Sequence, residues 1–149
     1  FDRLFPMGVA AMLEGVDLVR TAKAPKIPQD DAQATYEGWC TQDNARIDWG
    51  RQGAHIHNLV RGCNPAPGAW TTHAGKKLQI LETRHLAARD PGGIGGAMGA
   101  VVALDEAGFT IACADGRMRV ERVRPDGGAK LSAAEFAAAA GVTIGERLT

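Results

Sequence analysis

The sequence predicts a mainly β domain with a few attached helices. Stretches in which apolar and polar residues alternate dominate the second half of the chain, and such alternation is typical of half-buried strands. Glycine-containing turn signals separate these stretches, and Asp115-Gly116 is a strong hairpin signal among them. Helical spacing of apolar residues is limited to the N-terminus, the middle and a short segment near the C-terminus. The expected strands cover residues 69–72, 77–86, 100–104, 109–114 and 117–124.

The first 22 residues predict a helix that runs from about Pro6 to Ala22. Proline suits the first turn of a helix, and the apolar side chains around it recur at helical spacing. A helix packed on a domain is favoured over a membrane-surface or partner-binding helix. If no other domain covers the apolar stripe, we expect it to fold back on the rest of the chain or to pair with a second copy. The stripe contains Phe5, Val9, Met12, Leu13 and Val16.

Residues 23–45 have the composition of a linker, because they contain prolines and few large apolar side chains. Residues 46–149 are expected to form one compact domain, since a chain of 149 residues can bury one good core. The chain begins with Phe1 rather than Met. We therefore expect it to be a piece of a longer protein.

The segment from Arg46 to Thr72 predicts a helix between two short extended pieces. Asp48 is a favourable N-cap residue, so we expect the helix to begin directly after it. The dipeptide Asn64-Pro65 cannot continue a helix and is expected to end it. The buried face of this helix is predicted to consist of Ile56, Leu59, Val60 and Cys63.

Three local features are expected in the strand-rich part of the chain. Gly75 marks the turn of the first hairpin. The glycine-rich segment 88–99 predicts a loop and is the best candidate for disorder. It does not predict a phosphate-binding loop, because its glycines do not fit the spacing of a GxGxxG motif. A bulge near Glu121 and Arg122 would return the valine that follows to the buried face of its strand.

The C-terminal region predicts one short helix. Ser132 and Glu135 have the spacing of a capping box, in which each side chain bonds to the backbone of the other residue. The helix is expected over 133–140, with Gly141 closing it. Residues 142–144 are expected to add one short strand.

Charge and cysteine content narrow the function classes. The 17 basic and 17 acidic residues balance, which counts against strong independent binding to nucleic acid. The sequence contains no apolar run long enough for a membrane span. It shows no charged region followed by an apolar core and a cleavage site, so we expect no signal peptide. Cys40, Cys63 and Cys113 lack the spacing of a disulfide framework or a zinc site, so we expect a cytoplasmic protein without a metal site. Cys63 and Cys113 are expected to be buried as small apolar residues.

The chain is not expected to hold an active site of its own. His55 and His57 lie two positions apart on the expected helix and point in different directions, so they cannot share a metal ion. Cys63 follows His57 by six residues and lies on another face of the helix. HExxH, GxSxG and P-loop motifs are absent from the sequence. We therefore assign no catalytic residue.

Four motifs stand in a fixed order along the chain: Ala34-Thr35-Tyr36-Glu37-Gly38, Ile47-Asp48-Trp49, Ile56-His57-Asn58-Leu59-Val60-Arg61-Gly62 and Pro67-Gly68-Ala69-Trp70-Thr71. In this order and spacing they resemble the C-terminal half of the formyltransferases that use 10-formyltetrahydrofolate. That family includes methionyl-tRNA formyltransferases, the hydrolase part of 10-formyltetrahydrofolate dehydrogenases and sugar-nucleotide formyltransferases. The resemblance extends from about Phe5 to Leu148.

The resemblance implies a small open β-barrel similar to the OB-fold for residues 46–149. It implies that residues 1–22 are the last helix of a Rossmann-like catalytic domain in the same chain, joined by the linker 23–45. In the family that other domain carries the catalytic residues and uses 10-formyltetrahydrofolate as the formyl donor. The implied role of this chain is non-catalytic: it positions the acceptor or the partner domain for formyl transfer.

Two groups of residues are candidates for contacts. His57, Asn58 and Arg61 on the helix, together with Tyr36 in the linker, could contact the catalytic domain or the substrate, and solvent-exposed residues without such a role are the alternative. A basic group could contact the phosphates of tRNA, and a charged strand face that discourages aggregation is the alternative. The basic group contains Lys76, Lys77, Arg117, Arg119, Arg122 and Arg124.

A second function from a different class remains open. The chain could be an autonomous OB-like module that binds tRNA or single-stranded nucleic acid. Such modules stack bases on aromatic side chains in a basic groove. The aromatic content of 5% disfavours this function.

Overall fold

The structure is a computed structural model of the whole chain, and it describes residues 2–87 and 95–149. Most of the expected glycine-rich loop therefore lies outside the described residues. The chain divides into two compact units, Phe1–Gly38 and Trp39–Thr149. In chain order the elements are α1 (Leu4–Arg20), the 3-10 helix η1 (Asp31–Gln33), α2 (Gly53–Cys63), β1 (Trp70–His73), β2 (Lys76–Ala87), β3 (Val101–Asp105), β4 (Gly108–Cys113), β5 (Gly116–Pro125), β6 (Leu131–Ser132) and α3 (Ala133–Ala140).

The first unit consists of α1, η1 and extended segments. The expected N-terminal helix is confirmed, with bounds that differ by two residues at each end, and Pro6 lies in its first turn. No residue of α1 is buried, although its large apolar side chains include Met12, Leu13 and Val19. Among residues 2–38, no second apolar surface therefore covers the stripe of α1.

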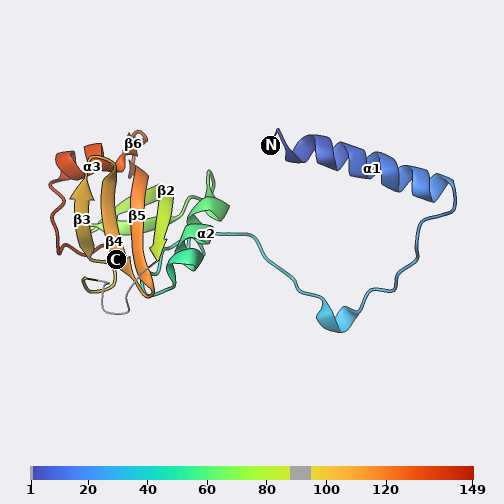
Figure 1. Cartoon of the computed structure of the whole chain (residues 1–149), viewed down its shortest axis with the longest axis horizontal. Helices are drawn as coiled ribbons and strands as arrows, with labels where there is room; N and C mark the ends of the chain where they lie inside the picture. Colours follow the sequence, from blue (N-terminus) through green and yellow to red (C-terminus); the bar gives the residue numbers. More distant parts are fainter. Residues whose placement is uncertain (1, 88–94) are drawn as a thin grey trace. The chain divides into compact units, whose positions relative to one another are not determined.

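The second unit is built on one antiparallel sheet. Its strands follow the order β1-β2-β5-β4-β3, and β6 pairs with β5 (Figure 1). Helix α2 packs against β2 and β5, whereas α3 packs against β4, β5 and β6. The prediction of a mainly β fold with a few helices is confirmed, in the form of an open antiparallel sheet.

Turns and register confirm several local predictions. His73 pairs with Lys76, which leaves Ala74 and Gly75 as a two-residue turn in which both residues have positive φ. In the pairing of β2 with β5, the residues on both sides of Glu121 have partners while Glu121 itself has none. This is the expected bulge, and it explains why Val123 is buried.

The hydrophobic core lies between the sheet and the two helices. Phe109 on β4 has no exposed surface and is the largest fully buried side chain, with Phe136 of α3 packed 6.4 Å away between ring centroids. The expected face of α2 is confirmed, because Ile56, Val60 and Cys63 are buried and Leu59 packs against the core. Cys113 is also buried, as expected, whereas Cys40 is exposed.

The start of α2 differs from the prediction. Asp48 does not cap the helix, because its Oδ1 accepts the N–H of Gly50 at 2.9 Å and closes a local turn instead. The helix begins at Gly53, and the N–H of Gly53 donates to Oδ1 of Asp115 at 2.6 Å. The cap therefore comes from the turn between β4 and β5, which no local sequence signal could indicate.

The predicted start and end of α3 are confirmed. The hydroxyl of Ser132 accepts the N–H of Glu135 at 3.1 Å, and the carboxylate of Glu135 accepts the N–H of Ser132 at 2.9 Å. Gly141 closes the helix with a φ of 70°, the left-handed conformation that glycine adopts readily.

The expected strand at 142–144 is wrong. Val142 is buried and donates its N–H to the carbonyl of Ala137, so it completes the end of α3 instead of pairing with the sheet. The last residues then bond to both outer strands of the sheet. Leu148 donates to Gly99 at 2.9 Å, just before β3, while Thr149 and Thr72 of β1 exchange two backbone hydrogen bonds. The C-terminal segment thus connects the two edges of the sheet.

No helix in the described part of the chain is long and apolar enough to cross a membrane.

Candidate functional site

The three polar residues expected to act together on α2 are separated by the structure. His57 is half-buried, and its Nδ1 lies 3.1 Å from Oγ1 of Thr83 on β2. Asn58 and Arg61 are exposed and bond to each other, with 3.0 Å between Arg61 Nε and Asn58 Oδ1. His57 therefore faces the sheet, and only Asn58 and Arg61 are available to a partner.

Tyr36 lies in the first unit and is 92% exposed. Trp39, the first residue of the second unit, is 93% exposed, although large aromatic side chains are usually at least partly covered. The sequence motifs pointed to Tyr36 and gave no signal for Trp39.

The expected basic row on β5 is largely engaged with groups of this chain. Arg119 forms an ion pair with Asp105, and Arg124 donates to Oε1 of Gln79 at 2.7 Å. Arg122 lies close enough to Glu135 to contribute to the lowering of its pKa, although the first cause is the hydrogen bond from the backbone of Ser132. The ion pair offsets the charge of Arg119, and the hydrogen bond to Gln79 occupies one donor of Arg124, so β5 offers less to phosphates than the row suggested.

The two lysines of the basic group have different surroundings. Lys76 is exposed, whereas Lys77 lies 4.9 Å from the ring centroid of Trp70 and also donates to Gln42. Lys77 and Arg124 line one small cavity of about 310 Å³. The structure therefore brings together two of the six basic candidates.

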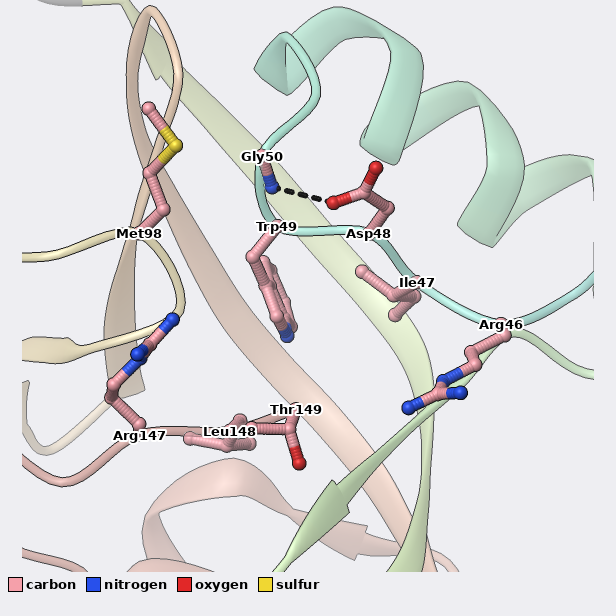
Figure 2. A pocket seen from close by; sticks show the side chains of 9 residues that line it. All are labelled: Arg46, Ile47, Asp48, Trp49, Gly50, Met98, Arg147, Leu148 and Thr149. Atoms are coloured by element: carbon pink, nitrogen blue, oxygen red, sulfur yellow. Dashed lines mark hydrogen bonds between the residues drawn. The ribbon is translucent and has the colours of Figure 1, made fainter.

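A larger cavity, of about 560 Å³, lies between the segment before α2 and the C-terminal residues. Figure 2 shows the guanidinium groups of Arg46 and Arg147 on either side of the Trp49 indole. Trp49 is held in place because its Nε1 donates to Oγ1 of Thr71 at 3.0 Å, and only 4% of the residue is exposed. The cavity is lined by Arg46, Ile47, Asp48, Trp49, Gly50, Met98, Arg147, Leu148 and Thr149.

The charges around this cavity suit an anionic group. The Arg46 guanidinium lies 5.5 Å from the ring centroid of Trp70, which orients it without neutralising its charge. Among the described residues, the Arg147 side chain makes no hydrogen bond or ion pair. Asp48 is already partnered by Arg51, with 3.5 Å between Nε and Oδ2. Arg46 and Arg147 therefore each offer a guanidinium group to a phosphate or carboxylate at this cavity.

Sequence reasoning missed both arginines of this cavity. Arg46 immediately precedes the Ile47-Asp48-Trp49 motif, which could have drawn attention to it. Arg147 gave no local signal, because only the pairing of the C-terminal segment with Gly99 brings it to the cavity.

A second group of reactive side chains lies at the start of α2. Donor atoms of His85, Cys113 and Asp115 lie within 4.8 Å of one another. Burial raises the pKa of the Cys113 thiol, and the nearby Asp115 adds to the effect, so the protonated thiol can donate to Asp115 Oδ1 at 3.8 Å. The hydrogen bond from Gly53 is the main cause that lowers the pKa of Asp115. Asp115 therefore serves as the acceptor at the start of α2. The partial positive charge of a helix N-terminus disfavours a metal ion bound by His85, Cys113 and Asp115.

The family model "Formyl transferase, C-terminal domain" matches residues 40–141. The chain belongs to this family. The matched residues fall entirely within the second unit and include α2, the strands β1 to β6 and α3. The resemblance found in the sequence motifs is thereby confirmed.

The similar curated proteins have related functions. A methionyl-tRNA formyltransferase from Moorella thermoacetica is 36% identical over 126 residues, which cover 85% of this chain and 39% of the relative. A methionyl-tRNA formyltransferase from Symbiobacterium thermophilum is 34% identical over 99% of this chain and 45% of its own length. The human mitochondrial 10-formyltetrahydrofolate dehydrogenase is 41% identical over 90 residues. The chain spans less than half the length of these relatives.

Solved structures show the same fold. The crystal structure of HypX from Aquifex aeolicus in complex with tetrahydrofolic acid matches with a TM-score of 0.65 at 20% sequence identity. The match covers 93% of this chain and 24% of that chain. At this identity the match supports the fold alone.

Proposed function

We propose that this chain is the non-catalytic C-terminal part of a 10-formyltetrahydrofolate-dependent formyltransferase of the methionyl-tRNA formyltransferase type. The observation that carries the proposal is the family match over 40–141, together with relatives that extend over more than twice the length of this chain. The formyl donor is then a substrate of an N-terminal Rossmann-like domain in the same protein. The role of this chain is to position the acceptor or that domain in a cytoplasmic enzyme.

The sheet supports a structural role of this kind. Its two outer strands, β1 and β3, both bond to the C-terminal segment, which agrees with a small open barrel similar to the OB-fold. A sheet whose two edges are connected in this way holds surface residues at fixed distances. Arg46 and Arg147 would then present a fixed anion-binding cavity to an acceptor that carries phosphate groups.

The exposed apolar side chains of α1 favour the presence of a partner domain. Its apolar side chains, among them Met12, Val16 and Val19, are exposed, and an unpaired stripe of this size needs a cover. We assign that cover to the catalytic domain of the same protein. Self-association through α1 is the other outcome, and the concentration dependence of the molecular mass in solution distinguishes it.

The test uses a fusion in which the N-terminal half of the Moorella thermoacetica relative precedes this chain. The chain alone should transfer no formyl group from 10-formyltetrahydrofolate to methionyl-tRNA, whereas the fusion should transfer it. The intact relative is the positive control and its N-terminal half alone is the negative control. Formyl transfer by the chain alone would overturn the proposal.

The second candidate function, an autonomous module for tRNA or single-stranded nucleic acid, has less support. The arginines of β5 pair with groups of the same chain, and the balanced net charge provides no general attraction to phosphates. Binding of tRNA to the chain alone should therefore be weak even at low salt. Tight, steeply salt-dependent binding that the double variant Arg46→Ala, Arg147→Ala abolishes would favour the module instead.

A further inference from the structure

The thiols of Cys40 and Cys63 lie side by side although the residues are 23 positions apart. Their Sγ atoms are separated by 3.7 Å. Cys40 is exposed and is the second residue of the second unit, whereas Cys63 is the last residue of α2 and is 3% exposed. One thiol is therefore open to solvent, with the other directly behind it.

Two hydrogen bonds hold the segments of both cysteines against the same turn. Gln42, two residues after Cys40, donates from Nε2 to the carbonyl of Pro67 at 2.8 Å. The N–H of Gly68 donates to the carbonyl of Cys63 at 2.8 Å. The two sulfur atoms can therefore meet without a rearrangement of the fold.

The surroundings give the two thiols different reactivities. Burial raises the pKa of Cys63 to about 11, and the hydrogen bond and charge of Cys40 contribute further. Cys63 thus remains a protonated thiol at neutral pH. A solvent-borne oxidant meets Cys40 first, because accessibility and thiolate character decide which cysteine reacts.

We propose that Cys40 is a modification site for hydroperoxides and that Cys63 converts the product to an intramolecular disulfide. In the first step the Cys40 sulfur attacks hydrogen peroxide; an S–O bond forms, the O–O bond breaks and water leaves. In the second step the Cys63 sulfur attacks the Cys40 sulfur; an S–S bond forms, and the hydroxyl leaves as water with the thiol proton of Cys63. Two thiols and one peroxide give one disulfide and two waters, a two-electron oxidation.

The disulfide would join the point where the linker reaches the second unit to the end of α2. Oxidation would thereby fix Cys40, two residues before Gln42, to the end of α2. This inference rests on the geometry of the second unit alone, and it holds or fails independently of the proposed formyltransferase role.

The experiment treats the reduced 149-residue chain with hydrogen peroxide, blocks free thiols and digests with trypsin. Cleavage after arginine and lysine places the cysteines in the peptides 27–46, 62–76 and 90–117. We expect 27–46 and 62–76 to be linked and the intact mass to fall by about 2 Da for the two hydrogens lost. The peptide 90–117, which carries Cys113, should remain free and acts as an internal control.

Two variants separate the steps. Cys40→Ser changes an exposed residue, so the fold should be retained while the linked peptides disappear. Cys63→Ala should stop the reaction after the first step, so that dimedone labels the sulfenic acid on 27–46. Unlinked peptides in the treated wild type, a link to 90–117, or a covalent dimer in place of the internal disulfide would each overturn the proposal.

Discussion

Helices α1 and α3 are both rich in apolar residues, yet only α3 buries them within its own unit. Ala133, Phe136 and Ala137 of α3 pack on the sheet, and a capping box fixes where the helix starts. Helix α1 is twice as long, but it has no buried residue and no side-chain cap at Arg3. An apolar stripe thus predicts a helix well and its packing partner poorly, since most helical stability comes from the surface that covers the stripe.

The largest expected effect tests whether buried and exposed apolar side chains contribute differently to the free energy of unfolding. Phe109→Ala removes a fully buried ring and should lower the free energy of unfolding by about 3–5 kcal/mol, because a cavity remains in the core. Met12→Ala in α1 should change it by less than about 0.5 kcal/mol. Urea denaturation of both variants measures these values. A large loss for Met12→Ala would show that α1 is covered within this chain.

The C-terminal segment offers the same contrast within a few residues. Leu148 is buried and lies where this segment meets the sheet, so Leu148→Ala should cost about 2–5 kcal/mol. Ile144 is 66% exposed, and Ile144→Ala should cost less than about 0.5 kcal/mol. Equal effects in urea denaturation would contradict the assignment of the segment as the connection between the two sheet edges.

The start of α2 depends on one hydrogen bond to a distant residue, Asp115. Asp115→Ala removes the acceptor for the Gly53 N–H and should cost about 1 kcal/mol, within the range for N-cap residues. The folded-state pKa of Asp115 is lowered from its ordinary value of 3.8. Its contribution is therefore complete above pH 3.8 and is lost as the pH falls through the lower folded-state value.

Acid unfolding monitored by circular dichroism measures this pH dependence. The wild type should lose its advantage over Asp115→Asn as the acid end is reached. If the two proteins differ by the same amount at neutral pH and below the folded-state pKa, the carboxylate charge is not what stabilises the start of α2.

The smallest expected effect separates the two kinds of polar residue on α2. His57→Ala removes the half-buried contact with Thr83 and should cost about 1 kcal/mol. Arg61→Ala removes only an exposed contact with Asn58 and should cost less than about 0.5 kcal/mol. Thermal unfolding of the pair resolves the difference. A larger loss for Arg61→Ala would reverse our assignment of which residue faces the sheet.

Local signals predicted most of the fold correctly. The capping box of Ser132 and Glu135, the turn at Gly75 and the bulge at Glu121 depend on residues close in sequence, and all three are confirmed. The predicted start of α2 directly after Asp48 and the predicted strand at 142–144 were wrong. In both cases a distant partner decides the outcome: Asp115 for α2, and the edges of the sheet for the last residues.

The candidate site was less predictable than the fold. The basic residues of β5 were visible as a row, but the acidic partners that offset them lie on other elements, such as Asp105 on β3. Arg147 and Trp49 meet only because the chain end returns to the sheet. The same holds for Cys40 and Cys63, whose spacing in sequence gave no reason to pair them.

By itself the sequence determined the family, the order of the elements and the faces that become buried. These properties follow from residue periodicity, turn chemistry and motifs, all of which act over a few positions. Only the tertiary structure decided which charges are neutralised, which arginines share a cavity and which thiols touch. Those outcomes depend on contacts between residues far apart in the chain, and the sheet fixes such contacts only once all of its strands have paired.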